Sequence, residues 1–148
     1  MDFKVTGAGQ LADLAKRCRQ VGDKDITREL YRGLNRATKP PRDAVKRNLE
    51  LYLPDNYAAQ LRRRLRMSTR RRTGRNPGLS VAASTKVSRL DVLDRGRLRH
   101  PLFRNRRFWF EQPVKAGFFT DPMRRSEPQV TPELQAVMEG VLAKLDDS

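Results

Sequence analysis

Apolar residues recur at helical spacing through most of the first 52 residues of the chain. A first stripe, with spacings of three and four, predicts an amphipathic helix and consists of Leu11, Leu14, Cys18 and Val21. Gly22-Asp23 interrupts this stripe, and the Asp23 side chain is suited to cap a second helix. The second helix is indicated by a further stripe, Ile26, Leu30, Leu34 and Ala37.

The doubled proline Pro40-Pro41 must kink or end this second helix, because proline lacks an N–H and clashes with the preceding turn. Beyond it the helical stripe resumes and runs to Pro54 through Ala44, Val45, Leu49 and Tyr52. We therefore expect either one long helix with a break near residues 39–42 or two helices in line. Residues 55–65 are compatible with a short basic helix or with a loop.

Two segments with period-two alternation predict a β-hairpin. Leu65–Arg70 and Leu79–Ala83 alternate on either side of the turn signal Asn76-Pro77-Gly78, which leaves a long basic tip, Arg70–Arg75. A short strand is also expected at Phe3–Thr6, ended by Gly7 and Gly9.

A third strand is predicted at Phe108-Trp109-Phe110. Alternation places Phe108 and Phe110 on one face and Trp109 on the other. Both faces are then apolar, which favours a buried central strand over a platform on which nucleic-acid bases stack.

The other segments show weaker patterns. Residues 88–107 have little periodicity and are expected to form a loop, and residues 117–128 are expected to be irregular. Thr131-Pro132-Glu133 is a favourable helix start. The apolar face of this last helix consists of Leu134, Val137, Met138, Val141, Leu142 and Leu145.

The order strand, helices, strands, helix predicts an α+β fold. We expect a single domain over residues 1–148, with a small antiparallel sheet packed against the long, proline-kinked helical region and the C-terminal helix. The basic arm and its loops occupy about residues 61–107.

Positive charge is concentrated in the middle of the chain. The protein carries a formal charge of +15, and residues 61–107 contain 16 basic and 2 acidic residues, whereas residues 108–148 carry a net −3. Arginine outnumbers lysine fifteen to one in the middle segment, and its planar fork suits phosphate and carboxylate groups. This distribution indicates a surface that meets a polyanionic partner.

The densest part of this charge is a predicted basic arm. Its eight arginines fall within fourteen residues: Arg62, Arg63, Arg64, Arg66, Arg70, Arg71, Arg72 and Arg75. The arm could bind DNA phosphates, with an affinity that falls as salt rises, or dock onto an acidic ring of protein. It could also be a solvated hairpin tip, although the self-repulsion of such a tip destabilises the fold.

Few residues suggest catalysis or metal binding. His100 is the only histidine, and Asp91 and Asp94, the only acids in the basic middle, are expected to pair with Arg95 and Arg97. Cys18 is a lone cysteine within an apolar stripe and is interpreted as a core residue. The sequence has no glycine-rich phosphate loop, no zinc-site spacing and no carboxylate cluster, so we expect no enzyme activity, no metal and no cofactor.

The sequence also lacks the features of membrane insertion. The first residues do not have the layout of a signal peptide, and no apolar run approaches the ~18 residues of a membrane span. We expect the protein to be made in the cytoplasm and to have no membrane partner.

Residues 95–122 resemble a family of small morphogenesis proteins of tailed bacteriophages, the neck or tail-completion proteins that join head to tail. Three motifs carry the resemblance: Arg99-His100-Pro101-Leu102-Phe103-Arg104-Asn105-Arg106, the aromatic strand Phe108-Trp109-Phe110, and Gly117-Phe118-Phe119-Thr120-Asp121-Pro122. Looser similarity covers nearly the whole chain, from Leu11-Ala12-Asp13-Leu14-Ala15-Lys16 through the mid-helix Lys39-Pro40 to the stretch at 73–78. A second proline at position 41 departs from the family pattern, which has one.

The resemblance implies a non-enzymatic virion protein at the head–tail junction of a long-tailed phage, assembled in the host cytoplasm. Its expected partners are further copies of itself in a ring of six or twelve, the stopper and adaptor proteins, the tail tube, and the genomic DNA that passes through. Residues expected to serve structure or interfaces are Arg99, His100, Pro101, Phe103, Asn105, Arg106, Trp109, Phe119, Thr120 and Pro122.

The charge asymmetry suits head-to-tail contacts in such a ring. The acids of one copy would then meet the basic middle of the next, and they are Glu133, Glu139, Asp146 and Asp147. A neck position and a tail-terminator position remain open. The alternative is a small basic nucleic-acid-binding protein acting on its own, which charge alone supports.

Overall fold

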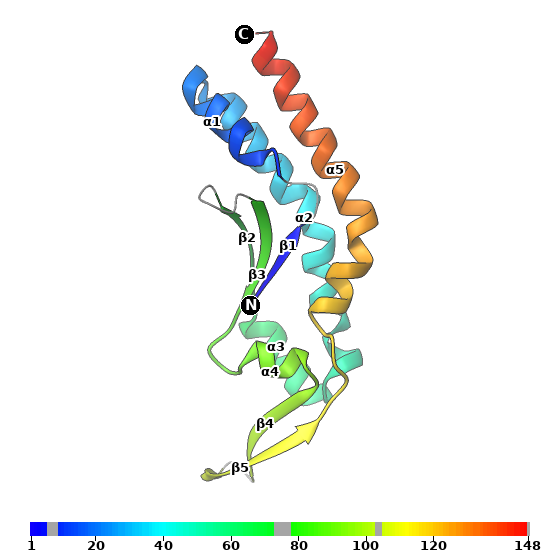
Figure 1. The fold of residues 1–148 in the computed structure, drawn as a ribbon. Helices are drawn as coiled ribbons and strands as arrows, with labels where there is room; N and C mark the ends of the chain where they lie inside the picture. The colour runs from blue at the N-terminus through cyan, green and yellow to red at the C-terminus, as the bar shows by residue number, and fades with distance from the viewer. Residues whose placement is uncertain (6–8, 73–77, 103–104, 148) are drawn as a thin grey trace.

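The computed structural model describes residues 1–5, 9–72, 78–102 and 105–147, and these form an elongated α+β molecule. Two long helices, α2 (Lys24–Tyr52) and α5 (Thr120–Asp146), lie side by side and run in opposite directions (Figure 1). The other elements are β1 (Asp2–Val5), α1 (Leu11–Val21), α3 (Asp55–Arg64), β2 (Arg66–Arg72), β3 (Gly78–Ser84), α4 (Leu90–Asp94), β4 (Arg97–Leu102) and β5 (Asn105–Pro113).

The core follows the apolar stripes of the long helices. α2 contributes Leu30, Leu34, Val45 and Leu49, and α5 contributes Leu134 and Val141, all at most 2% exposed. The two helices approach closely at Gly33, where an added Cβ would lie 2.4 Å from Cγ1 of Val137. No helix among the described residues is long and apolar enough to cross a membrane.

The N-terminal helices begin and end as predicted. Gly22 adopts a left-handed conformation (φ 73°) that ends α1, and the Asp23 carboxylate accepts hydrogen bonds from the backbone N–H groups of Asp25 and Ile26 at the start of α2. Residues 55–64 form the short helix α3 rather than a loop.

Of the two expected arrangements, the structure has the single long helix. α2 runs through Pro40 and Pro41 without interruption. The prolines cannot donate to the preceding turn, but Arg42 donates from Nε to the carbonyl of Thr38 (3.2 Å) and from Nη2 to that of Asn35 (2.9 Å). Thr38 also donates to the carbonyl of Leu34 (2.9 Å). The carbonyls that lose a helical donor are those of Arg36 and Ala37, so these side-chain bonds add to neighbouring carbonyls and do not replace the lost ones. The packing of α2 against α5 also stabilises the continuous helix.

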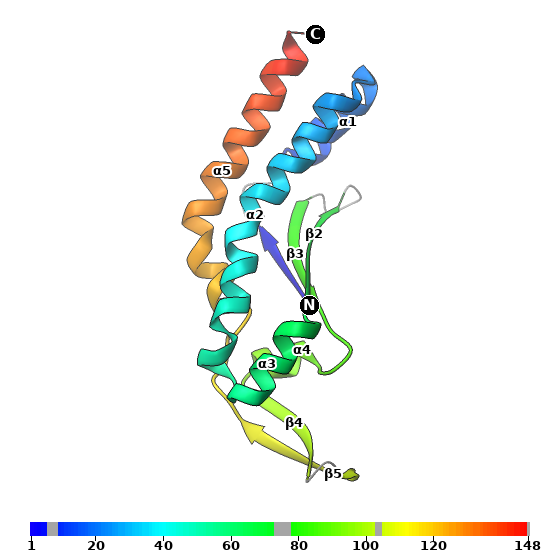
Figure 2. The ribbon, with the colours of Figure 1, turned by 180° about the vertical axis from the view of Figure 1, so that it is seen from behind.

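The predicted hairpin is confirmed as β2 and β3, which form an antiparallel sheet in the order β1-β3-β2. On one face Thr69 and Phe3 lie opposite Val81, and the Thr69 and Thr38 hydroxyl oxygens are 2.8 Å apart. This inner face packs against α2 (Figure 2). The predicted turn residues 76 and 77 and the arm residue Arg75 lie outside the described residues.

The prediction of a loop over residues 88–107 is wrong. This segment contains α4 and β4, and β4 pairs with β5 in a two-stranded antiparallel ribbon that extends from one end of the molecule (Figure 1). The expected aromatic strand exists as part of β5. It is neither central nor buried, because it belongs to this separate ribbon and not to the three-stranded sheet.

The last helix begins eleven residues earlier than predicted. α5 starts at Thr120 and continues through Pro128 and Pro132, so residues 120–128 are helical and not irregular. Pro122 lies in the first turn, where a missing N–H is tolerated. Further along, Ser126 donates a hydrogen bond to the Pro122 carbonyl (2.8 Å). Thr131-Pro132-Glu133 is therefore an interior segment and not a helix start.

Candidate assembly interface

Two glycines close the base of the β4–β5 ribbon. Gly96 (φ 95°) precedes β4, and its carbonyl accepts a hydrogen bond from the backbone N–H of Val114 (2.9 Å). Gly117 (φ 97°) follows β5, and its N–H donates to the carbonyl of Asp94 (2.8 Å). Such backbone angles favour glycine, since a Cβ is strained there. The ribbon is thus joined to the body by a tight, hydrogen-bonded junction.

Asp94, at the end of α4, caps the start of α5. Its carboxylate accepts hydrogen bonds from the backbone N–H groups of Phe119 (2.9 Å) and Thr120 (3.1 Å), and also from the Thr120 hydroxyl. A negative charge at this position complements the helix dipole and satisfies N–H groups that have no partner within the helix. Asp94 therefore connects α4, the ribbon base and α5.

The motif residues that follow β5 anchor α5 in the core. Phe118 and Phe119 are 0% and 1% exposed, with ring centroids 6.4 Å apart, and Pro122 is buried. Tyr52, at the end of α2, donates a hydrogen bond to Asp121 (3.1 Å). Phe119, Thr120 and Pro122 thus hold the ribbon base and the long helices together.

The predicted ion pairs of the basic middle are found in part. Arg95 lies 3.4 Å from Asp91, as expected, and Arg89 also contacts this carboxylate (3.3 Å). Arg97 instead lies 4.0 Å from Glu111, across the ribbon. It does not pair with either aspartate, because Asp94 is used at the start of α5.

The ribbon exposes its aromatic side chains on both faces. Phe108, Trp109 and Phe110 are 61%, 51% and 51% exposed, so the prediction that they form a buried strand is wrong. Apolar residues on both faces of a strand predict burial within the chain. Here they occur on a ribbon that extends from the body of the protein. A period-two pattern does not distinguish a buried strand from such an exposed ribbon.

The two faces of the ribbon differ in composition. The register shifts between Pro101 and Leu102, so it assigns no face to the exposed residues Arg106 and Phe108. We use the name phenylalanine face for these two residues together with Phe110. One face of the ribbon carries Phe110 and His100, whose ring packs edge-on against Phe110 (5.6 Å between centroids). The other carries Trp109 with Arg97, Arg99 and Glu111. Pro101 lies opposite Trp109 in the register and Asn105 begins β5, whereas Phe103 lies outside the described residues.

Trp109 borders an open groove beside the ribbon. The Arg99 guanidinium lies 5.0 Å from the centre of the Trp109 ring, a cation–π contact that restrains the indole. The groove has a volume of about 540 Å³, and its other wall includes Val87, Arg89 and Val92. This combination of tryptophan and arginine is enriched where proteins contact one another.

The eight arginines of the predicted arm do not form one continuous surface. Arg62, Arg63 and Arg64 occupy the last turn of α3, where Arg62 pairs with Glu50 (3.0 Å). Arg66, Arg70, Arg71 and Arg72 belong to β2. Because a strand rises about 3.3 Å per residue, Arg66 and Arg70 lie roughly 13 Å apart along β2.

The β2 arginines are further divided between the two faces of the sheet. Arg71 lies on the inner face with its guanidinium 3.4 Å from the centre of the Tyr31 ring. Arg66 and Arg70 lie on the outer face with Lys4, and Arg70 is 3.9 Å from Asp2. The central strand contributes only small residues to this outer face: Gly78, Ser80, Ala82 and Ser84. Ser80 and Ala82 are only 5% and 3% exposed, so the exposed part of this face is formed mainly by the basic side chains of the two outer strands.

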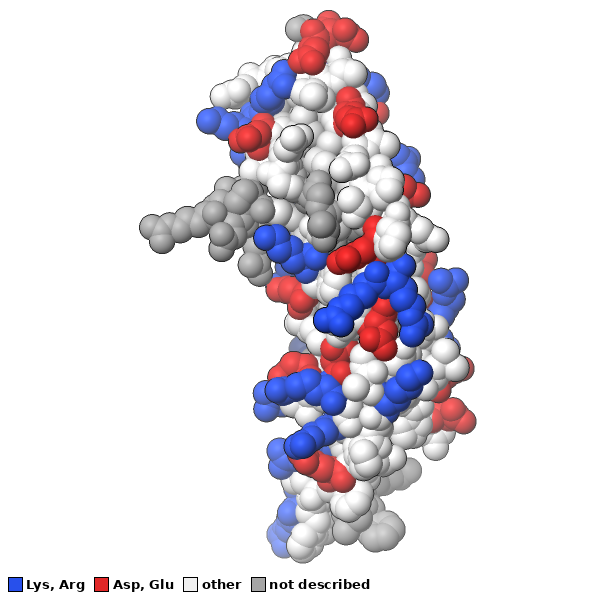
Figure 3. Space-filling model, turned by 45° about the vertical axis from the view of Figure 1, so that its right-hand side comes forward, with Lys and Arg blue, Asp and Glu red and all other residues white. Residues whose placement is uncertain are grey.

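Acidic and basic side chains are mixed elsewhere. Figure 3 shows them interspersed over the body, with acidic side chains gathered at the C-terminal end of α5. Among the described residues there is no group of three or more side chains suited to hold a metal ion. Cys18 is a free thiol, 1% exposed, and burial raises its pKa.

Comparisons with family models, with curated proteins and with solved structures find no match to this chain. The resemblance to phage neck proteins therefore depends on the sequence motifs alone. What the geometry adds is their division into a buried anchor, residues 117–122, and an exposed ribbon.

Proposed function

We propose that the protein is a structural subunit of the head-to-tail junction of a long-tailed phage, acting in the neck or as a tail terminator. In this proposal it works without catalysis or cofactor, by assembling into a ring of six or twelve copies. The ring joins the head connector to the tail tube in the virion and lets DNA pass. Assembly takes place in the host cytoplasm.

The exposed aromatic ribbon is the observation that carries this proposal. Each of its three aromatic side chains is at least half exposed, which corresponds to roughly 300 Å² of surface at ~200 Å² per ring. Exposed patches of this size on a monomer often mark interaction sites. A two-stranded ribbon is also marginally stable by itself. Both properties are accounted for if the ribbon is covered by another protein subunit.

Basic residues around the aromatics also support a protein partner. Residues 95–113 contain six arginines and one glutamate, a net charge of +5 with His100 neutral. Aromatic and arginine side chains together dominate the energetics of protein interfaces. The resemblance over residues 95–122 covers this ribbon, which links the proposed function to the exposed surface.

The mass of the purified protein, measured by light scattering with and without purified tail tubes, tests the proposal. We expect a species of about six or twelve times 17.1 kDa, either alone or on the tube end. A Trp109→Ser/Phe110→Ser variant should lose this species while keeping its far-ultraviolet circular dichroism. A protein that stays at 17.1 kDa under both conditions contradicts the proposal.

A free-standing nucleic-acid-binding protein is the second candidate, and the outer face of the sheet favours it. Lys4, Arg66 and Arg70 are exposed on this face and could contact a phosphate backbone. This candidate predicts that Arg66→Glu/Arg70→Glu weakens duplex binding in a salt titration, whereas the matched pair Arg63→Glu/Arg64→Glu on α3 has a smaller effect. Equal effects of the two pairs, or no binding at all, would count against it.

A further inference from the structure

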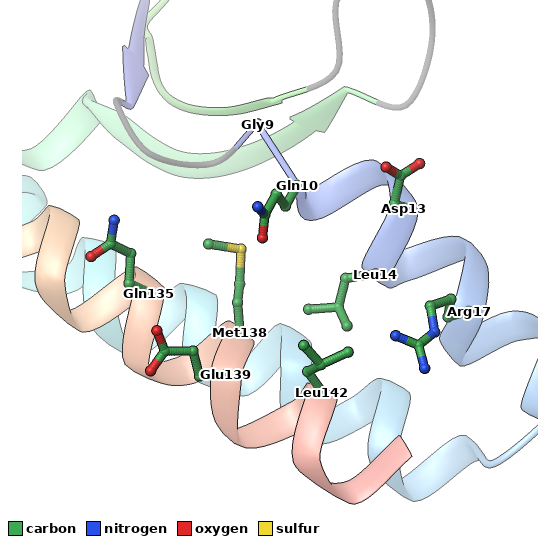
Figure 4. A pocket seen from close by; sticks show the side chains of 9 residues that line it. All are labelled: Gly9, Gln10, Asp13, Leu14, Arg17, Gln135, Met138, Glu139 and Leu142. Atoms are coloured by element: carbon green, nitrogen blue, oxygen red, sulfur yellow. The ribbon is translucent and has the colours of Figure 1, made fainter. Parts of the chain in front are cut away.

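A second apolar surface lies at the opposite end of the molecule from the ribbon. An open groove of about 590 Å³ runs between α1 and α5 (Figure 4). Leu14 extends from α1 toward Leu142 of α5, and Met138 lies beside them. Leu142 is 36% exposed, one of the few large apolar side chains that are exposed outside the ribbon. Leu14 and Met138 are 6% and 8% exposed, so Leu142 supplies most of the apolar surface that the groove offers to a partner.

The rim of this groove carries uncompensated acids. Asp13 and Glu139 are exposed lining residues, and neither makes an ion pair within the part of the chain that the structure describes. Arg17, the lining cation, lies 2.8 Å from Asp146 and is neutralised by it. The groove thus combines an apolar floor with free negative charge.

The phenylalanine face of the ribbon is complementary to this groove. Phe108 and Phe110 offer exposed apolar rings, and Arg106, two residues before Phe108 in β5, is an exposed cation. Phenyl rings pack favourably against a methionine sulfur, and Met138 is in the groove floor. Opposite charges at the rim would set the orientation of the two surfaces.

The two surfaces cannot meet within one chain. The ribbon base is joined to Thr120, and Leu142 lies 22 residues further along α5, or about 33 Å at 1.5 Å per residue. The ribbon extends away from the groove (Figure 1). Contact between them therefore requires two copies, arranged head to tail.

We propose that the phenylalanine face of one copy docks in the α1–α5 groove of the next copy. Phe108 and Phe110 cover Leu14, Met138 and Leu142, while Arg106 pairs with Glu139 or Asp13. The contact is heterologous, because it joins different surfaces of the two copies. Repeating it gives a closed ring when the rotation from one copy to the next brings the last copy back to the first. This inference rests on the proposed ring function and names the two surfaces that build it.

Cysteine cross-linking between separate chains tests the contact. Two variants, Phe110→Cys and Leu142→Cys, are mixed and oxidised, and we expect a mixed disulfide dimer. The native Cys18 is 1% exposed and does not compete. The matched control replaces Leu142→Cys with Leu51→Cys, which alters a large apolar residue that is 71% exposed but lies outside the groove. A chain carrying both Phe110→Cys and Leu142→Cys should give a ladder of covalent multimers.

A charge exchange tests the orientation. Arg106→Glu and Glu139→Arg should each weaken assembly about tenfold, and the double variant should recover most of that loss. A ring that forms at the expected mass without the Phe110–Leu142 cross-link, or with equal cross-linking to Leu51→Cys, overturns the docking inference and leaves the ring function in place. A protein that remains monomeric with tail tubes present overturns the proposed function itself.

Discussion

Asp94 joins α4, the ribbon base and α5, so its replacement by alanine tests whether this junction stabilises the fold. The carboxylate accepts two backbone hydrogen bonds, at 2.9 and 3.1 Å, and one from the Thr120 hydroxyl. Loss of an N-terminal helix cap costs about 1 kcal/mol and up to ~2. A hydrogen bond to a charged group contributes about 1.5–3 kcal/mol. Because the bonds share one acceptor they are not additive, and we expect Asp94→Ala to cost about 2–3 kcal/mol.

Urea unfolding followed by circular dichroism measures this cost at a fixed protein concentration. The transition midpoint should fall while the slope with denaturant stays the same. Thr120→Val, which removes only the hydroxyl donor, should cost about 1 kcal/mol. Asp94→Asn, which keeps an acceptor without the charge, should fall between the wild type and Asp94→Ala.

Asp91 provides the matched control, because it is an aspartate of the same short helix. Its ion pairs with Arg89 and Arg95 are exposed, and such pairs contribute little to stability. Asp91→Ala should leave the midpoint unchanged. If the two alanine variants unfold at the same urea concentration, Asp94 does not hold the junction together and the reasoning fails.

Three further predictions concern close packing, backbone strain and burial. Gly33→Ala should cost about 1–3 kcal/mol in urea unfolding, because its Cβ meets Val137, and Gly33→Ala/Val137→Ala should recover part of the loss. Gly117→Ala should cost about 1–3 kcal/mol because of its positive φ, whereas Gly9→Ala, which meets no neighbour, should not. Burial raises the pKa of Cys18, so native stability should fall above about pH 9, where only the unfolded thiol ionises, and less so in Cys18→Ala.

The N-terminal half could be predicted because its signals are local. The Leu11–Val21 stripe, the Gly22 end and the Asp23 cap each depend on neighbouring residues, and all are found. The hairpin of β2 and β3 likewise follows from alternation within two short runs. The continuity of α2 through its prolines does not follow from the local pattern, because it also depends on packing against α5 and on side-chain bonds from Arg42 and Thr38.

The start of α5 could not be predicted because its cap comes from a distant residue. Asp94 lies 25 positions before Phe119, and the segment itself offers no favourable cap, since Phe119 occupies that position. Thr131-Pro132-Glu133 has the local features of a helix start, and the sequence pattern therefore predicts the start there. Here the tertiary contact of Asp94 overrides the local propensity for a helix start at residue 131. The same contact joins the start of α5 to the base of the ribbon.

The ribbon shows that an apolar sequence does not by itself predict that a strand is buried within its own chain. A strand that is apolar on both faces is expected either in the core of a chain or in the core of an assembly, and its sequence is the same in both cases. In the isolated chain Phe108, Trp109 and Phe110 remain half exposed, while Phe118 and Phe119, a few residues further on, are fully buried. The two aromatic groups of one motif thus have different physical roles. Substitutions in the second group should unfold the monomer, whereas substitutions in the first should leave the monomer folded and affect only what assembles on it.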